Sequence, residues 1–541
     1  MKQLLLLVFL SISFLGIAQH QDKVDFILGT FDVYPQPLKK VISGRVSYKF
    51  QALQEVDSIF LDAKNMIFEN VTLNAEEVRP HGLKLRKQQI EYVNDSSKLV
   101  LRNRFEKGKM YSLRFEYEAK PVQTAYFLNW KDDDPNNNQI WTQGQGKYTS
   151  HWLPSFDDMN EKVMFNLSIV TNKNVFAIAN GKLLEFVELS DGLKVWRYNM
   201  KKPISSYLLA FAIGNYNKQE LKSKSGIPIE NYYYPLDSLK VEPTYRYTKE
   251  IFDFLELEIG VPYPWQNYKQ IPVHDFLYAG MENTTATIFS DQYVIDSTAF
   301  VDKNYVNVNA HELAHQWFGN LVTEKDGHHH WLHEGFATYY AYLAERHLFG
   351  DDHFYWKLLN SLNELRNTID KGEGQSLLDP KASSLTFYEK GAWALFMLRN
   401  SIGDEDFKEG VKSYLEKFQF KNVTVDDFLK ELEIVSEKDL SGFRKEWLES
   451  TGLPLEMAKA QLANKSPSIQ LLFDIQEELK AAQSDDIDYQ RYWDTSNSIH
   501  LKEHLLKNYE GSFPFDGLRK AFESDTIPVR QALLEAKSFD N

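Results

Sequence analysis

The sequence predicts an α+β protein of several domains, with a β-rich N-terminal part, a mainly helical central part and a short helical C-terminal part. Three observations carry this prediction. The chain has 541 residues, which is more than one hydrophobic core serves. Hydrophobic residues make up 43% and charged residues 25%, as in ordinary globular proteins. The hydrophobic pattern also changes near Gly214, from short alternating runs to long helical periods.

Residues 23 to 215 are rich in short runs of alternating polarity, the pattern of half-buried strands. Turn residues such as Asn94-Asp95 separate the runs, and the polar stretch 131–138 is expected to be an exposed loop. The expected strands are 41–50, 98–104, 111–117, 163–170, 193–198 and 207–213.

After Gly214 the periods are helical, and glycines follow several of them where helix C-caps are expected, at Gly319, Gly350 and Gly403. The expected helices are 242–257, 304–318, 331–349 and 388–401, followed in the C-terminal part by 475–483, 501–509 and 525–536. We therefore expect domains at 19–216, 217–453 and 454–541, and we expect the last of them to be a short or truncated helical domain.

The first eighteen residues have the pattern of a cleavable signal peptide. Lys2 supplies the positive charge, residues 4–17 are apolar, and small residues precede a cleavage site after Ala18. The apolar run is short for a membrane span, and no later segment is long and apolar enough for one. We expect a secreted or periplasmic protein without a membrane span in its mature chain.

Composition excludes several kinds of site. The chain has no cysteine, so disulfides, thiolate nucleophiles and cysteine-based metal sites are ruled out, and any metal must be held by His, Asp or Glu. The formal net charge of −15 disfavours nucleic acid as a partner, because it repels the phosphate backbone. The sequence indicates no oligomeric state.

The segment from His311 to His315 reads HELAH, an H-E-x-x-H motif. On a helix the two histidines lie four residues apart on one face, so both imidazoles can reach one zinc ion with Glu312 beside them. Glu334 lies nineteen residues after His315, near the start of the next helical period, and is the candidate third ligand. Catalytic zinc takes three protein ligands and keeps the fourth position for water.

Four motifs in order along the chain resemble those of the M1 zinc aminopeptidases. They are Thr142–Gln145 (TQGQ), Ala279–Asn283 (AGMEN), the metal block of His311–Thr323 with Trp331–Ala337, and Tyr388–Gly391 (YEKG). The sequence departs from the family at two motifs. His333 stands where the family has Asn before the third ligand, and Ala279-Gly280 replaces the usual opening of the G-A-M-E-N motif. We expect the first departure to change hydrogen bonding around the metal.

The resemblance implies an N-terminal β-sandwich or saddle-like domain, a thermolysin-like catalytic domain and an active site between them. It implies one zinc ion per chain, held by His311, His315 and Glu334. It assigns Glu312 as the general base and Tyr388 as the donor to the oxyanion. The residues that would bind a peptide with a free N-terminus are Gln143, Gln145, Ala279, Gly280, Met281, Glu282 and Asn283.

Other functions stay open at this point. A zinc endopeptidase would use the same metal chemistry, and a scaffold would bind zinc without catalysis. A branch of the family also hydrolyses a lipid epoxide, which depends on pocket shape. The run His328-His329-His330 is expected to be a solvated loop, because three consecutive imidazoles do not face one ion. We expect it to line the pocket rim.

Overall fold

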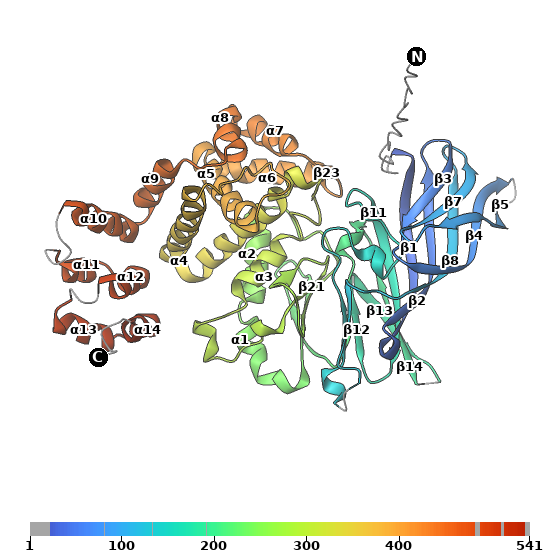
Figure 1. Cartoon of the computed structure of the whole chain (residues 1–541), viewed down its shortest axis with the longest axis horizontal. Coiled ribbons are helices and arrows are strands. Elements are labelled where there is room, and N and C mark those ends of the chain that lie inside the picture. The colour runs from blue at the N-terminus through green and yellow to red at the C-terminus, as the bar shows by residue number, and fades with distance from the viewer. Residues whose placement is uncertain are drawn as a thin grey trace, which may run out of the picture.

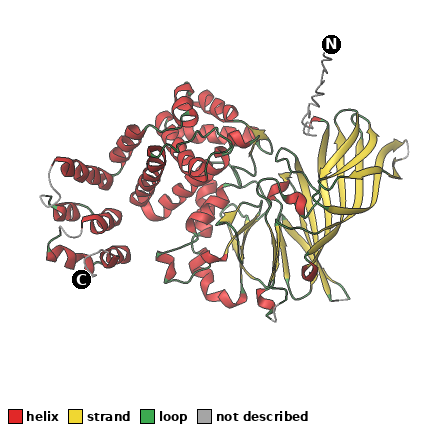
Figure 2. Cartoon of the chain, in the orientation of Figure 1, coloured by secondary structure: helices red, strands yellow, loops and turns green. Residues whose placement is uncertain are grey.

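The computed structural model describes residues 22–79, 82–131, 134–190, 192–481, 487–509 and 513–535. The expected signal peptide, residues 1–18, lies outside the described residues. Strands gather in the N-terminal part of the molecule and helices in the remainder, with the last helices farthest from the strands (Figures 1 and 2). The predicted α+β architecture, β-rich first and helical later, is therefore confirmed.

The largest sheet has nine strands and makes up most of the N-terminal part. Its second strand in sequence shows why it forms, because Val46, Tyr48 and Phe50 are buried on one face while Arg45 and Lys49 alternate with them and are exposed. The strand order is β13 (Lys182–Glu188), β14 (Leu193–Asn199), β11 (Lys162–Asn172), β1 (Val24–Gln36), β2 (Val41–Ala52), β8 (Met110–Ala119), β4 (Met66–Arg79) and β5 (Gly82–Gln89), with β15 (Ile204–Ser205) also paired to β11.

Two smaller sheets complete this part. One contains β3 (Val56–Asp62), β7 (Lys98–Phe105) and β6 (Glu91–Asn94), and the other β12 (Phe176–Ala179), β16 (Phe211–Gly214), β10 (Gln139–Thr142) and β9 (Ala125–Leu128). The strand predicted at 207–213 is wrong in its first half. A 3-10 turn at Ser206–Leu208 precedes β16, and the Leu209 backbone N–H closes it by donating to the Ser206 carbonyl at 3.0 Å.

A five-stranded mixed sheet follows and leads to the central helices. Its order is β17 (Asn217–Lys222), β18 (Pro228–Tyr233), β19 (Tyr268–Val273), β21 (Ala286–Ser290) and β20 (Gly280–Met281). All residues of β19 and β21 are buried, as expected for strands covered on both faces. The short strand β20 pairs antiparallel with β21 and forms the edge of this sheet.

The central helices are α1 (Val241–Tyr245), α2 (Thr248–Ile259), α3 (Val306–Ala314), α4 (Trp331–Asp370), α5 (Gly391–Ile402), α6 (Asp404–Phe418), α7 (Val425–Ser436) and α8 (Ser441–Phe443). A π-helical turn, η10 (Thr386–Lys390), leads into α5. Between α3 and α4 the short strand β22 (Thr323–Glu324) pairs with β23 (Asn422–Val423). The helix predicted at 242–257 is divided at Arg246-Tyr247 into α1 and α2.

The predicted C-cap glycines take the backbone geometry that favours glycine. The φ angles are 122° at Gly319, 89° at Gly350 and 104° at Gly403. At Gly350 the chain does not leave the helix for a loop. Helical residues continue on both sides of it, so α4 is a long helix with a break in its middle.

The C-terminal helices are α9 (Leu455–Lys465), α10 (Pro467–Ala481), α11 (Tyr489–Thr495), α12 (Ile499–Tyr509), α13 (Phe515–Phe522) and α14 (Ile527–Glu535). They contact the central part through Asp352 of α4, whose carboxylate accepts hydrogen bonds from Ser468 and Ser498, both at 2.6 Å. Among the described residues, no helix has the length and apolar character needed to cross a membrane.

Candidate metal centre and active site

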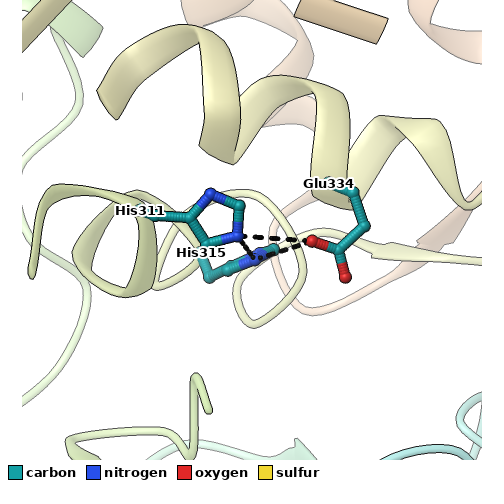
Figure 3. A group of neighbouring side chains, drawn as sticks. All are labelled: His311, His315 and Glu334. Carbon is teal, nitrogen blue, oxygen red and sulfur yellow. Dashed lines mark hydrogen bonds and ion pairs between the residues drawn. The ribbon is translucent and has the colours of Figure 1, made fainter. Parts of the chain in front are cut away.

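The side chains of His311, His315 and Glu334 meet at one point between α3 and α4 (Figure 3). His311 lies on α3, His315 is the C-cap residue of this helix one turn later, and Glu334 lies in the first turn of α4. The Nε2 atoms of the histidines are 3.0 Å apart, and each lies 3.3 Å from Glu334 Oε2. The structure thus brings together all three of the ligands expected from the sequence.

This triangle has the size that zinc requires. With bonds of 2.0–2.1 Å in tetrahedral geometry, neighbouring ligand atoms lie about 3.3 Å apart. The Oε2 atom of Glu334 is buried without a hydrogen bond of acceptable geometry among the described residues, which is costly for a carboxylate unless a cation satisfies it. Two imidazoles and one carboxylate are also a donor set typical of catalytic zinc. The residues therefore fit a zinc ion.

The surrounding backbone fixes the orientation of one ligand. The Phe318 carbonyl can only accept, so Nδ1–H of His315 donates to it at 2.9 Å and the lone pair of Nε2 is left for a metal. Burial opposes ionisation of Glu334, but the neighbouring His315 outweighs it and holds the pKa of that carboxyl well below its usual value. The third ligand is therefore kept as an anion.

Glu312 projects from the same helix into the same space. Its side chain is buried, and its Oε2 atom has no hydrogen-bond partner among the described residues. Burial raises the pKa of Glu312 well above its usual value, and the carboxylates of Glu282 and Glu334 raise it further. A carboxyl with a raised pKa beside a metal can both accept and return a proton near neutral pH.

Tyr388 lies beside the metal ligands, on the π-helical turn η10. Its ring stacks on the imidazole of His311, with the planes inclined by 5°. The turn packs closely on α4, because a Cβ atom built on Gly335 would lie 2.9 Å from the Cα of Gly391. Burial raises the pKa of Tyr388, so its hydroxyl stays protonated and can donate a hydrogen bond.

A cavity of about 440 Å³ contains these groups. Gln145 reaches it from the segment after β10, and Ala279, Gly280 and Glu282 reach it from the segment of β20. Helices α3 and α4 and the turn η10 form the rest of its wall. The cavity therefore lies where the β-rich part meets the helical part, as the sequence predicts.

The other three residues predicted to bind substrate lie behind this wall. Gln143 accepts a hydrogen bond from the Gln145 backbone at 3.1 Å, and its Nε2 lies 3.3 Å from Gln145 Oε1. Met281 and Asn283 are buried, with the Asn283 amide near the Leu208 carbonyl. Gln143 thus holds Gln145 in place, while Met281 and Asn283 support the strand that carries Gly280.

Glu282 is held in the wall of the cavity by contacts of its backbone. Its side chain is buried, and its backbone carbonyl accepts from Asn320 Nδ2 at 2.8 Å and from Gln316 Nε2 at 3.3 Å. Burial raises the pKa of its carboxyl, and Glu334 raises it further while His315 opposes this. A cationic group entering the cavity would relieve that cost by pairing with the carboxylate.

The prediction of a solvated loop at His328–His330 holds only for His328, which is exposed. His329 is largely buried and accepts a hydrogen bond from the Val425 backbone N–H at 3.2 Å. His330 turns inward, and its Nδ1 lies 3.0 Å from Glu324 Oε2. Its other ring nitrogen lies 3.6 Å from Glu334 Oε1. The carboxylates attract this ring strongly enough to overcome burial and raise the pKa of His330 to about 9.

The neighbouring His333, which stands where the family has asparagine, contacts the same residue as His330, namely Glu324. Its Nε2 accepts a hydrogen bond from the Glu324 backbone N–H at 2.6 Å. Glu324, His330 and His333 gather their donor atoms within 4.8 Å, the size of a metal site. A neutral His333 that accepts at Nε2 carries its proton on Nδ1, however, so the nitrogen that faces Glu324 cannot bind an ion. This group surrounds the metal ligands without forming a second metal centre.

Comparison with solved structures supports this fold. An M1 zinc metallopeptidase from Deinococcus radiodurans is similar to this chain with a TM-score of 0.67 at 21% identity, over 80% of this chain and 95% of that one. A mutant of that metallopeptidase, bound to a Tyr-Ser-Ala substrate, is similar with the same TM-score at 20% identity, over 80% of this chain and 96% of its own.

Curated relatives and family models identify the family. A leucyl aminopeptidase of Saccharolobus solfataricus is 28% identical over 74% of this chain and 52% of its own length. A glutamyl aminopeptidase of Rattus norvegicus is 29% identical over 64% of this chain and 38% of its own. The chain thus spans about half of the length of the first relative and less of the second. The M1 N-terminal domain matches residues 23–208 and the peptidase family M1 domain matches residues 244–447, so the chain belongs to peptidase family M1.

Proposed function

We propose that this chain is an exported zinc aminopeptidase that hydrolyses the N-terminal peptide bond of peptides. The observation that carries this proposal is that a buried carboxylate, Glu282, opens into the same cavity as the metal ligands. The ligands alone support any zinc peptidase, whereas a fixed anion beside them selects a substrate with a free α-ammonium group. The names of the curated relatives, which are aminopeptidases, support the same activity.

The chemistry of bond cleavage follows from three groups. The triad of His311, His315 and Glu334 would hold a zinc ion, which would supply a water molecule of lowered pKa and polarise the scissile carbonyl. Glu312 takes the proton of the attacking water on its free Oε2 and passes it to the leaving amine. The Tyr388 hydroxyl donates to the oxygen of the tetrahedral species, a contact worth about 3 kcal/mol in other hydrolases.

Hydrolysis is limited to the first peptide bond because the α-ammonium group of the substrate is held at a fixed distance from the metal site. The Glu282 carboxylate pairs with the α-ammonium, and the side chain of Gln145 accepts from it. Gln143 keeps Gln145 in place through its 3.1 Å contact with the Gln145 backbone. The edge strand β20 offers backbone groups at Gly280 to an extended peptide, which adds to the sheet as a further strand.

Export is part of the proposal and rests on the apolar N-terminal segment with its cleavage site after Ala18. The exported protein should begin at Gln19, which N-terminal sequencing of the secreted or periplasmic fraction reads directly. An exported chain that still carried the first eighteen residues would contradict it.

Two substitutions test the activity. Glu312→Gln should remove hydrolysis while leaving one zinc per chain, because it deletes the base and none of the ligands. Glu282→Gln should lower kcat/KM for a free peptide by roughly 100-fold, since a charged hydrogen-bond partner of the amine is lost. Glu312→Gln with unchanged turnover would contradict the mechanism. Unchanged kcat/KM in Glu282→Gln would leave a zinc endopeptidase as the better description.

A further inference from the structure

The side chain of Lys357, a cation, lines the active-site cavity, although it belongs to none of the motifs found in the sequence. Among the described residues that line this cavity, Lys357 is the only lysine or arginine. It lies in the second half of α4, twenty-three residues after Glu334. The rest of the lining is acidic or neutral apart from the two histidines of the metal site, so this ammonium group stands out by its charge.

The position of Lys357 depends on the break in α4. Its Nζ pairs with Glu345 Oε2 in the first half of the same helix, although twelve residues span about 18 Å on a straight helix. The φ angle of 89° at Gly350 turns the chain and lets the two side chains meet. The pair is further held by Asn307 Nδ2, which donates to Glu345 Oε2 at 2.9 Å, and by the Tyr342 ring 4.7 Å from Nζ.

The ammonium group retains capacity for a ligand. A lysine has three donors, and the pair with Glu345 uses one of them. Glu345 is the buried member, with 8% of its side chain exposed, while Lys357 is 27% exposed and faces the cavity. Glu345 thus fixes the lysine from behind and leaves its outer side open.

Lys357 and Glu282 lie toward opposite ends of the cavity. Gln316, two residues after α3 ends, contacts the backbone of Glu282, and Asn307, in the first turn of α3, contacts the partner of Lys357. The helix between them, from Asn307 to Ala314, is about 10 Å long. The metal ligands His311 and His315 lie between them, so the cavity has an anion at one end, the metal site in the middle and a cation at the other end.

We propose that Lys357 binds the C-terminal carboxylate of the substrate, so that the enzyme prefers peptides of three or four residues with both ends free. This rests on the proposed aminopeptidase function, in which Glu282 holds the amine. An extended peptide spans about 3.3–3.6 Å per residue, so three or four residues reach from one charged end of the cavity to the other. In a shielded cavity a lysine and a carboxylate attract more strongly than in open solvent.

The role of Lys357 is tested by substrates that differ only in the charge of their C-terminus. Trialanine and its C-terminal amide have the same scissile bond and the same free amine, and differ only in that charge. In the wild-type enzyme we expect kcat/KM for the acid to exceed that for the amide by roughly tenfold or more, the size of one charged hydrogen bond. For an octaalanine and its amide the ratio should be near one, since its C-terminus lies beyond the cavity.

Variants assign the effect to Lys357. Lys357→Gln should bring the acid-to-amide ratio for trialanine close to one, Lys357→Arg should retain most of it, and Lys430→Gln, at an exposed site on α7, should leave it unchanged. If Lys357→Gln does not fold because Glu345 is left unpaired, the double variant Lys357→Gln, Glu345→Gln removes both charges together. It should show the same ratio near one.

The outcomes separate the two proposals. Hydrolysis of both trialanine forms with a wild-type ratio near one would overturn the role of Lys357 and leave the aminopeptidase standing. A tenfold ratio that persists in Lys357→Gln or in the double variant would also overturn it. No hydrolysis of any free peptide by the zinc-loaded enzyme would overturn the proposed function itself.

Discussion

The phenol ring of Tyr388 lies parallel to the imidazole of His311, with ring centroids 5.4 Å apart. This stacking joins a metal ligand on α3 to the π-helical turn η10, and it sets the distance of the hydroxyl from the metal site. The extra residue of a π-turn commonly appears at functional sites, where it points a side chain that a regular helix would turn away. The position of Tyr388 beside the metal site is thus set by a contact between two separate elements.

Tyr388→Phe should lower kcat by roughly 100- to 1,000-fold, because it removes one donor to the oxyanion while the stacked ring remains. KM should change little, since the hydroxyl acts mainly in the transition state. Steady-state kinetics on a free tripeptide measure both constants, and the zinc content of the variant serves as the control. A kcat within a few-fold of wild type would rule out this role for the hydroxyl.

Gly335→Ala tests the close packing of η10 on α4. A Cβ atom there would lie 2.9 Å from Gly391 Cα and 3.3 Å from the Phe387 carbonyl oxygen, so the turn that carries Tyr388 must move. We expect a loss of about 1–3 kcal/mol in the free energy of unfolding, as for other overpacked sites. Denaturant unfolding measures this loss.

The displaced turn should also lower kcat in Gly335→Ala. Gly372→Ala is the control for added side-chain bulk, because nothing lies within 4 Å of the atom it adds. Its φ of 78° adds some strain, so it should cost stability without affecting kcat. Equal losses of kcat in the two variants would argue that the packing at Gly335 is unimportant for catalysis.

Zinc should stabilise the wild-type protein against heat. A ligand that binds only the folded state adds about 2.7 kcal/mol when present at 100 times its Kd. In Glu334→Gln the charged ligand is gone, so the same concentration of zinc should raise Tm much less. Differential scanning calorimetry of the metal-free proteins, with and without zinc, gives both shifts. A full zinc-induced shift in Glu334→Gln would show that this glutamate is not a ligand.

The stability of the β-rich part should depend on Glu161. This side chain is buried and accepts from the Phe26 backbone N–H at 3.0 Å, and burial raises the pKa of its carboxyl to about 8. The folded protein therefore binds a proton that the unfolded chain releases near pH 4.3. Its contribution to stability is complete below that pH and is lost as the pH rises toward 8.

Glu161→Gln keeps the acceptor for the Phe26 N–H and removes the titration. The difference in Tm between the variant and the wild type should therefore be small at pH 5 and should grow in favour of the variant up to pH 8. Thermal unfolding in a series of buffers measures it. A difference that stays constant over this range would contradict the raised pKa.

The sequence predicts much of this site because its key residues lie on regular elements. The four-residue spacing of His311 and His315 is enough to place both rings on one face of α3, and a glutamate early in the next helix completes the set. The positions of the C-cap glycines are also predicted by the sequence, since Gly319, Gly350 and Gly403 all take positive φ. Local periodicity and backbone preference decide these features.

The features that were missed depend on contacts between segments far apart in sequence. His330 turns inward because the carboxylate of Glu324, on a short strand, attracts it. Lys357 enters the cavity only because α4 breaks at Gly350. The glycine predicts that the helix is interrupted there, but it does not predict where the second half of the helix goes. Gln143 lies behind Gln145 because the chain turns directly after β10. No periodicity in the sequence signals these three placements.

The most direct test of the central claim is the hydrolysis of one tripeptide in its free and N-acetylated forms by metal-free and zinc-reconstituted protein. We expect release of the first residue from the free form alone, and only when zinc is present, because Glu282 must pair with the α-ammonium. Equal cleavage of both forms would contradict the anchoring of the amine. Cleavage by the metal-free protein would contradict the metal centre.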